Sequence, residues 1–211
     1  PCEWEGNYGP TSVLIDTIVR GDGSNALFTS PFRVIWANGN ERQVSTCQGT
    51  EGDPAPYHTT APPACAKNHI TVGALNSDDD SITSFTSFGP TDDGRLKPDI
   101  SAPGCQDSDD FGVTSCSSAS TTSYTQKCGT SMASPTVCGL SALFLQDFRA
   151  QYPGEPDPRN STHKAILANT AEDIANPGPD FQSGYGSVRI QPAIDLMRAG
   201  NFFEGEVSQG E

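Results

Sequence analysis

The stretch Gly129-Thr130-Ser131-Met132-Ala133-Ser134-Pro135 places a serine hydroxyl among small residues, directly before an apolar-periodic run from Val137 to Tyr152. The run repeats its apolar residues at three- and four-residue steps, which predicts a long helix opened by Ser131 and ending near Ala150. A helix N-terminus offers unsatisfied N–H groups and the positive end of the helix dipole. Both stabilise the negative charge that develops during acyl transfer, so Ser131 is a candidate nucleophile.

Short apolar segments bounded by Pro and Gly alternate with helical patterns around that stretch. Strands are expected at 32–37, 70–75 and 98–104, with a weaker edge strand at 82–88 and a hairpin within 105–128. Further helices are expected at 13–20, at 157–170 with Asp157 and Pro158 as its start, and at 191–199. This alternation predicts an α/β fold with a mainly parallel sheet covered by helices on both faces.

The first of these helices has clear sequence signals at both ends. Thr11 or Ser12 can cap its start and Gly21 can stop it. Its apolar face is expected to be formed by Val13, Leu14, Ile15 and Ile18.

The composition indicates a loop-rich, strongly acidic chain. Of 211 residues, 34% are hydrophobic, with 21 Gly and 17 Pro, and no apolar run approaches the roughly 18 residues that span a membrane. Twelve basic against 26 acidic residues give a net charge of −14, which argues against nucleic acid as a partner. The acidic spots at 78–80, 92–93 and 107–110 are interpreted as solvated loops, with structural calcium as the alternative. No metal-ligating residue is assigned, and no cofactor is required.

Seven cysteines favour an oxidising compartment and hence a secreted protein. No C-x-x-C unit is present and the histidines do not cluster with the cysteines, which argues against a zinc site. Cys138 is expected to be a buried free thiol on the inner face of the Ser131 helix. Among the 15 pairings open to the other six, we considered Cys47 with Cys65, Cys105 with Cys116, and Cys128 or Cys2 with a segment outside this chain.

The stretch from Gly129 to Pro135, with Val137 and Gly139 after it, resembles the nucleophile motif of the subtilisin-like serine peptidases (subtilases). Other segments resemble further motifs of that family and occur in the family's order: Ala37–Glu41, Ala66–Ala74, Ser87–Pro90, Leu96–Gly104 and Gly184–Val188. The resemblance covers roughly residues 4–199 and implies a subtilisin-like fold.

The resemblance also implies roles for particular residues. Ser131 corresponds to the acylated nucleophile, and Asn40 to the side-chain donor of the oxyanion hole, which the Ser131 backbone N–H completes. Ala37, Asn38 and Gly39 lie where the loop borders the pocket for the substrate's P1 side chain. Asn38 departs from the family's usual alanine, so it bears on substrate preference.

Two members of the catalytic triad have no counterpart. In the family the Asp lies in a D-x-G strand end and the His in an H-G-T helix start, both upstream of the oxyanion loop. None of His58, His69 and His163 is followed by Gly-Thr, and no suitable D-x-G precedes Asn40. We therefore expect the sheet to be incomplete on its N-terminal side, with Asp and His in an upstream segment that was removed or belongs to a partner chain. Residues 1–200 are interpreted as the C-terminal portion of a peptidase domain and 201–211 as a tail or the start of a linker.

The resemblance implies a secreted serine endopeptidase that acts on polypeptides through an acyl-enzyme at Ser131. The alternative is a non-catalytic homologue or inactive fragment that acts as a binding or scaffold module. A lipase or esterase of the α/β-hydrolase type would require G-x-S-x-G, whereas Ser131 lies in G-T-S-M-A.

Overall fold

The computed structural model describes residues 4–21, 30–42, 57–106 and 112–205. Three parallel strands form one sheet in the order β1-β2-β3, with Val72 opposite Ile100, and β4 and β5 form a separate antiparallel hairpin. The α/β architecture predicted from the sequence is confirmed. The strands are β1 (Ile35–Ala37), β2 (Ile70–Asn76), β3 (Ile100–Cys105), β4 (Val113–Cys116) and β5 (Tyr124–Lys127), and the helices are α1 (Pro10–Arg20), α2 (Thr130–Gln151), α3 (Asn160–Asn169) and α4 (Ile190–Arg198).

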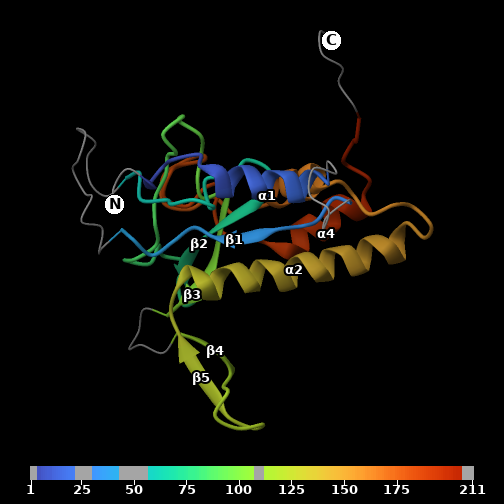
Figure 1. Ribbon diagram of the computed structural model, residues 1–211. Coiled ribbons are helices and arrows are strands. Elements are labelled where there is room, and N and C mark those ends of the chain that lie inside the picture. The colour runs from blue at the N-terminus through green and yellow to red at the C-terminus, as the bar shows by residue number, and fades with distance from the viewer. Residues whose placement is uncertain (1–3, 22–29, 43–56, 107–111, 206–211) are drawn as a thin grey trace.

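The core lies between the sheet and α2. Every residue of β2 is buried, as a strand covered on both faces requires. α2 packs along all three strands, and α1 lies on the opposite face of the sheet (Figure 1). The apolar cluster joins strand residues to residues of α2, α3 and α4: Ile70, Val72, Ala74, Ile100, Ala102, Ala133, Val137, Phe144, Phe148, Ile166, Leu167, Val188, Ala193 and Met197.

The predicted inner face of α1 is wrong for two of its four residues, while Ile15 and Ile18 are half-buried. Val13 and Leu14 are each 48% exposed, whereas Ser12, Asp16 and Val19 are buried. The reason is a polar contact, because the Asp16 carboxylate accepts hydrogen bonds from the backbone N–H groups of residues 67 and 68 just before β2. With Asp16 on the inner face, the side chains of Val13 and Leu14 face outward.

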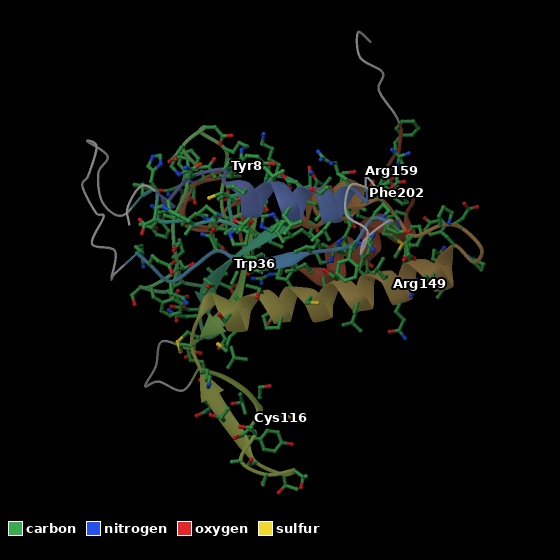
Figure 2. The ribbon with its side chains drawn as sticks, in the orientation of Figure 1. Tyr8, Trp36, Cys116, Arg149, Arg159 and Phe202 are labelled. Atoms are coloured by element: carbon green, nitrogen blue, oxygen red, sulfur yellow. A yellow bond between two sulfur atoms is a disulfide. The ribbon has the colours of Figure 1, made fainter. Side chains whose placement is uncertain are left out.

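β1 is an edge strand of the described sheet, and apolar side chains are exposed on it and on helices of both faces. It spans three residues, and Trp36 at its centre is 40% exposed (Figure 2). Val13 and Leu14 on α1 and Leu143 on α2 are exposed as well. Parallel sheets normally have both faces covered, so little apolar surface is left exposed on them. The edge of β1 therefore fits the expectation that the sheet is incomplete on its N-terminal side.

Three local predictions differ from the structure. The segment 82–88 forms no strand beyond a single bridge between Leu75 and Ile82. α1 has Gly9 rather than Thr11 or Ser12 as its N-cap residue. α3 starts at Asn160 because the side chain of Asp157 is engaged by Arg149 instead of capping the helix. None of the described helices is both long and apolar enough to cross a bilayer.

Candidate active site

The start of α2 is fixed to the end of β3. A disulfide joins Cys105 to Cys128, and the Gly129 N–H donates to the Gly104 carbonyl at 3.0 Å. Only glycine fits at 104, since a Cβ there would lie 2.8 Å from the Gly129 carbonyl oxygen. Gly129 has φ +150°, a backbone conformation that side chains disfavour. These contacts hold the exposed Ser131 at the carboxyl edge of the sheet.

Asn40 reaches the same edge from the loop that follows β1. Its Oδ1 accepts hydrogen bonds from the Thr130 N–H at 2.9 Å and from the Thr130 Oγ1 at 3.0 Å. Because a backbone N–H can only donate, the amide oxygen must face Thr130 and the Nδ2 group must point away. Among the described residues, neither Asn40 Nδ2 nor the Ser131 N–H has a hydrogen-bond acceptor. These two free donors lie close together at the start of α2, since a Cβ on Gly129 would be 3.6 Å from the Ser131 nitrogen and 3.7 Å from Asn40 Nδ2.

Thr130 was missed by reasoning from the sequence. It is fully buried, and its hydroxyl also accepts a hydrogen bond from the Gly39 N–H at 3.3 Å. A single side chain thus joins the Asn40 loop to the first residue of α2. The signal available in the sequence was a hydroxyl residue directly before the candidate nucleophile.

Hydrogen bonds from Ser87 also hold the Asn40 loop in place. The Ser87 N–H donates to the Gly39 carbonyl at 2.9 Å, and the Ser87 carbonyl accepts from Asn38 Nδ2 at 2.5 Å. Its hydroxyl accepts from the Glu41 N–H and donates to the Glu41 carboxylate at 2.8 Å. The segment predicted as an edge strand instead serves as the support of this loop.

The three residues predicted to border the P1 pocket lie in different environments. Ala37 ends β1 and Gly39 is half-buried, while Asn38 is only 1% exposed. The Asn38 Oδ1 accepts a hydrogen bond from the Thr60 hydroxyl at 2.9 Å, so both ends of its amide are engaged inside the protein. The substrate-binding role of this loop stays a prediction. Asn38 would influence substrate binding through the shape of the loop, because its own side chain is buried.

No described histidine is in contact with Ser131. His163 is buried against the Phe144 ring, and burial lowers its pKa to about 3. His69 is buried beside β2, and burial lowers its pKa well below the usual value. His58 lies 3.9 Å from an aspartate in another loop. Their rejection as catalytic bases from sequence context agrees with these positions.

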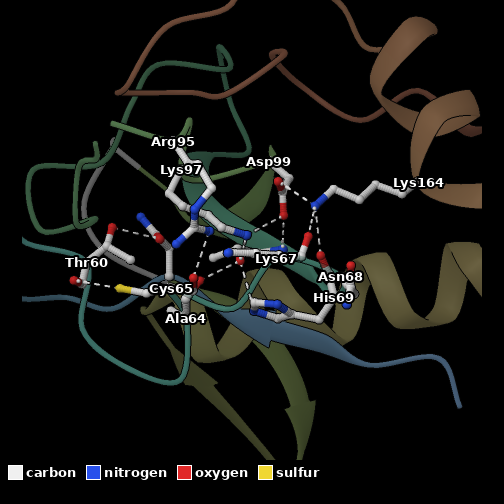
Figure 3. A network of polar contacts seen from close by, with 12 residues as sticks. Thr60, Ala64, Cys65, Lys67, Asn68, His69, Arg95, Lys97, Asp99 and Lys164 are labelled. Carbon is white, nitrogen blue, oxygen red and sulfur yellow. Dashed lines mark hydrogen bonds and ion pairs between the residues drawn. The ribbon is translucent and has the colours of Figure 1, made fainter. Parts of the chain in front are cut away.

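The Leu96–Gly104 motif builds a buried ion network behind the sheet (Figure 3). Lys97 Nζ donates to Thr71 Oγ1 at 2.7 Å and to Asp99 at 2.9 Å, and Asp99 also pairs with Lys164 at 2.8 Å. Burial lowers the pKa of Lys97 to about 8. Burial alone would raise the pKa of Asp99, but Lys97 and Lys164 together lower it to about 2. The network fixes the start of β3 against β2.

The cysteine predictions are partly wrong. The predicted Cys105–Cys116 pair is replaced by Cys105–Cys128, Cys116 is free and exposed, and Cys65 is free and buried rather than paired with Cys47. Cys138 is exposed, not buried. The antiparallel hairpin separates Cys116 from Cys105 and brings residue 128 back to the end of β3 instead. Cys2 and Cys47 lie outside the described residues.

Each of the two acidic spots within the described residues has one aspartate paired with an arginine. Asp80 pairs with Arg189, and Asp93 with Arg95 at 2.9 Å, while the spot at 107–110 lies outside the described residues. The part of the chain that the structure describes contains no group of three or more acidic, Cys or His side chains arranged to hold a metal. Structural calcium stays an untested expectation.

Comparison with known proteins identifies the family. The model of the Subtilase family (Peptidase_S8) matches residues 5–186. The chain belongs to the subtilase family. It is 34% identical over 156 residues to the serine protease AprX of Bacillus subtilis, covering 64% of this chain and 32% of AprX. It is 37% identical over 121 residues to the C5a peptidase of Streptococcus pyogenes, covering 56% of this chain and 9% of that protein.

Solved structures agree with the assignment of this subtilase. The protease CspB of Clostridium perfringens superposes with a TM-score of 0.59 at 26% identity, covering 69% of this chain and 30% of CspB. The chain thus spans about a third of AprX and of CspB and less of the C5a peptidase.

Proposed function

We propose that this chain is the nucleophile-bearing part of a secreted serine endopeptidase that hydrolyses polypeptides. The observation that carries the proposal is the pairing of Asn40 Oδ1 with Thr130, which leaves Asn40 Nδ2 and the Ser131 N–H as free donors close together at the start of α2. Membership of the subtilase family supports the reaction class, and the Cys105–Cys128 disulfide supports an oxidising compartment.

In the proposed reaction, Ser131 Oγ attacks the scissile carbonyl carbon and the carbonyl oxygen becomes an oxyanion. The oxyanion accepts hydrogen bonds from Asn40 Nδ2 and the Ser131 N–H, at the positive end of the α2 dipole. The amine then leaves, and water hydrolyses the ester formed on Ser131. Both steps need a base that takes the proton from Ser131 Oγ and gives it to the leaving amine, and then takes a proton from water and returns it to Ser131 Oγ.

The base is proposed to come from a segment upstream of this chain, since the described histidines lie elsewhere. Such a segment would also cover the exposed edge of β1 and the apolar side chains beside it. The isolated 211-residue chain is therefore expected to hydrolyse no peptide and to fold poorly. Peptide cleavage by the purified monomeric chain at the rate of an ordinary protease would contradict this.

The test is labelling of the complete gene product with a fluorophosphonate probe, which reacts with activated serines. We expect one equivalent of label on Ser131 and none on a Ser131→Ala variant. Asn40→Ala should retain the fold but lower kcat about 10²–10³-fold, the loss established for the corresponding asparagine of subtilisin, a member of the same family. A folded gene product that neither takes up the probe nor cleaves peptides would favour the binding or scaffold module.

A further inference from the structure

A groove of about 680 Å³ runs beside Ser131, between the first turns of α2 and the hairpin of β4 and β5. Figure 1 shows the hairpin projecting from the main body next to the start of α2, and Figure 2 places Cys116 on it. From α2 the groove is lined by Ser131, Met132, Pro135 and Thr136, which recur on one face of the helix. The candidate nucleophile is therefore one wall of an extended binding surface.

The lining residues show how the hairpin faces this groove. β5 contributes the alternate residues Thr125 and Lys127, while β4 contributes all four of its residues. Val113 lies opposite Lys127, and Ser115 opposite Thr125, so these four side chains share one face of the hairpin. That face is turned toward α2, and Lys127 on it lines the groove.

The hairpin is held firmly at this end. Its last strand residue, Lys127, is followed at once by Cys128, whose disulfide to Cys105 anchors the hairpin base to β3. The N–H of Gly129, the residue after Cys128, donates a hydrogen bond to the Gly104 carbonyl. The position of Lys127 relative to Ser131 is thus set by contacts of the main fold.

Lys127 is the one charged side chain among the described residues that line the groove. The other lining residues are small polar or apolar side chains, and the chain as a whole carries a net charge of −14. An exposed ammonium group in an otherwise uncharged groove attracts a carboxylate. The positive charge at Lys127 is also opposite in sign to the net charge of the chain.

We propose that this groove binds the leaving-group side of the polypeptide substrate and that Lys127 selects an acidic side chain there. The inference rests on the proposed function. The acyl side of the substrate is expected on the loop Ala37–Gly39, which reaches α2 through Asn40 and Thr130. A chain that crosses Ser131 from that loop continues into the groove on the other side of the nucleophile. The favoured substrate therefore carries Asp or Glu within the first few residues after the cleaved bond.

The experiment measures kcat/KM of the complete gene product on matched peptides that differ only in the second residue after the scissile bond. We expect the Glu peptide to be cleaved about five-fold faster than the Lys peptide, a size consistent with exposed ion pairs. Lys127→Gln should abolish the difference, and Lys127→Glu should reverse it. The preference should also shrink as salt rises from about 0.05 M to about 0.5 M, where charges are screened within about 5 Å.

Lys67→Gln is the matched control, because it removes one positive charge from another exposed lysine. It should leave the Glu-to-Lys ratio of the parent unchanged. Cleavage with no acidic preference, or with a preference that Lys127→Glu leaves unaltered, would overturn the role of Lys127 while the peptidase activity stands. Absence of both cleavage and fluorophosphonate labelling in a folded gene product would overturn the proposed function together with this inference.

Discussion

Replacing Lys97 by Met should strongly lower the free energy of unfolding of the protein. Lys97 is 1% exposed and its ammonium group satisfies both Thr71 Oγ1 and Asp99. Removing one partner of a buried ion pair costs about 3–5 kcal/mol because the other charge stays buried. Asp99 retains Lys164 at 2.8 Å and the Thr71 N–H at 2.7 Å, so the lower end, about 3 kcal/mol, is expected. For a chain of this size that lowers Tm by about 6–12 °C.

The assay is thermal unfolding of the complete gene product in a Ser131→Ala background, which prevents self-digestion during heating. The pH dependence gives a second signature. The pKa of Asp99 is lowered to about 2 in the folded protein, so its contribution to stability is complete above about pH 4 and is lost as pH falls through 2. The difference between the parent and Lys97→Met should therefore shrink below pH 4. It should grow above about pH 8, because the lowered pKa of Lys97 lets the folded parent lose that proton before the unfolded chain does.

Lys67→Met removes an exposed lysine whose ammonium group lies over an aromatic ring, and it should cost no more than about 1 kcal/mol. Replacing Asp99 by Asn in the Lys97→Met background should recover part of the loss, because a neutral amide then replaces a buried carboxylate that has lost one of its two ammonium partners. Lys164 keeps the carbonyl oxygens of residues 67 and 69 as acceptors. A Lys97→Met protein whose Tm matches that of the Lys67→Met control would show that the network contributes little, and the reasoning would be wrong.

Three further predictions concern other parts of the chain. Asn38→Ala should leave two buried hydrogen-bond partners unsatisfied and lower the free energy of unfolding in urea by about 2–4 kcal/mol. It should also lower kcat more than it raises KM, because it loosens the loop that carries the oxyanion donor. An unchanged kcat would count against this. His163→Phe should make the free energy of unfolding less dependent on pH in the acid range. The pKa of His163 is lowered to about 3, so in the parent the neutral buried imidazole costs stability progressively as pH falls from about 6.5 toward 3. Urea midpoints that fall between pH 7 and 4 with the same slope as in the parent would exclude this. The disulfide closes a loop with a sequence separation of 23, so Cys105→Ser with Cys128→Ser should cost about 3 kcal/mol, and a reducing agent should lower the Tm of the parent but not of the double variant.

The sequence was sufficient for the elements whose patterns are local. The parallel strands were predicted from short apolar runs, and α2 from its three- and four-residue periodicity. The meeting of Asn40 with the start of α2 followed from the family motifs, and the structure brings these residues together through Thr130. A residue after one parallel strand and a residue after another necessarily lie at the same edge of the sheet.

The features that were missed depend on contacts distant in sequence. The inner face of α1 could not be read from its apolar residues, because Asp16 docks the helix through backbone N–H groups about 50 residues away. The role of Ser87 likewise depends on its alignment with Gly39 and Glu41. Both cases replace an expected apolar contact with a hydrogen-bonded one, which hydrophobic periodicity does not detect.

The exposed edge of β1 and the absent base have a common physical origin. Each of the exposed side chains Val13, Leu14, Trp36 and Leu143 would gain about 1 kcal/mol from losing its remaining exposure, so covering them adds several kcal/mol. That is a large part of the stability of an ordinary domain. Any strand that adds parallel to β1 ends at the same edge of the sheet as Ala37, three residues before Asn40. The contact that completes the fold therefore also delivers its carboxyl-terminal residues to the side of Ser131, and folding and catalytic competence should be gained in one step.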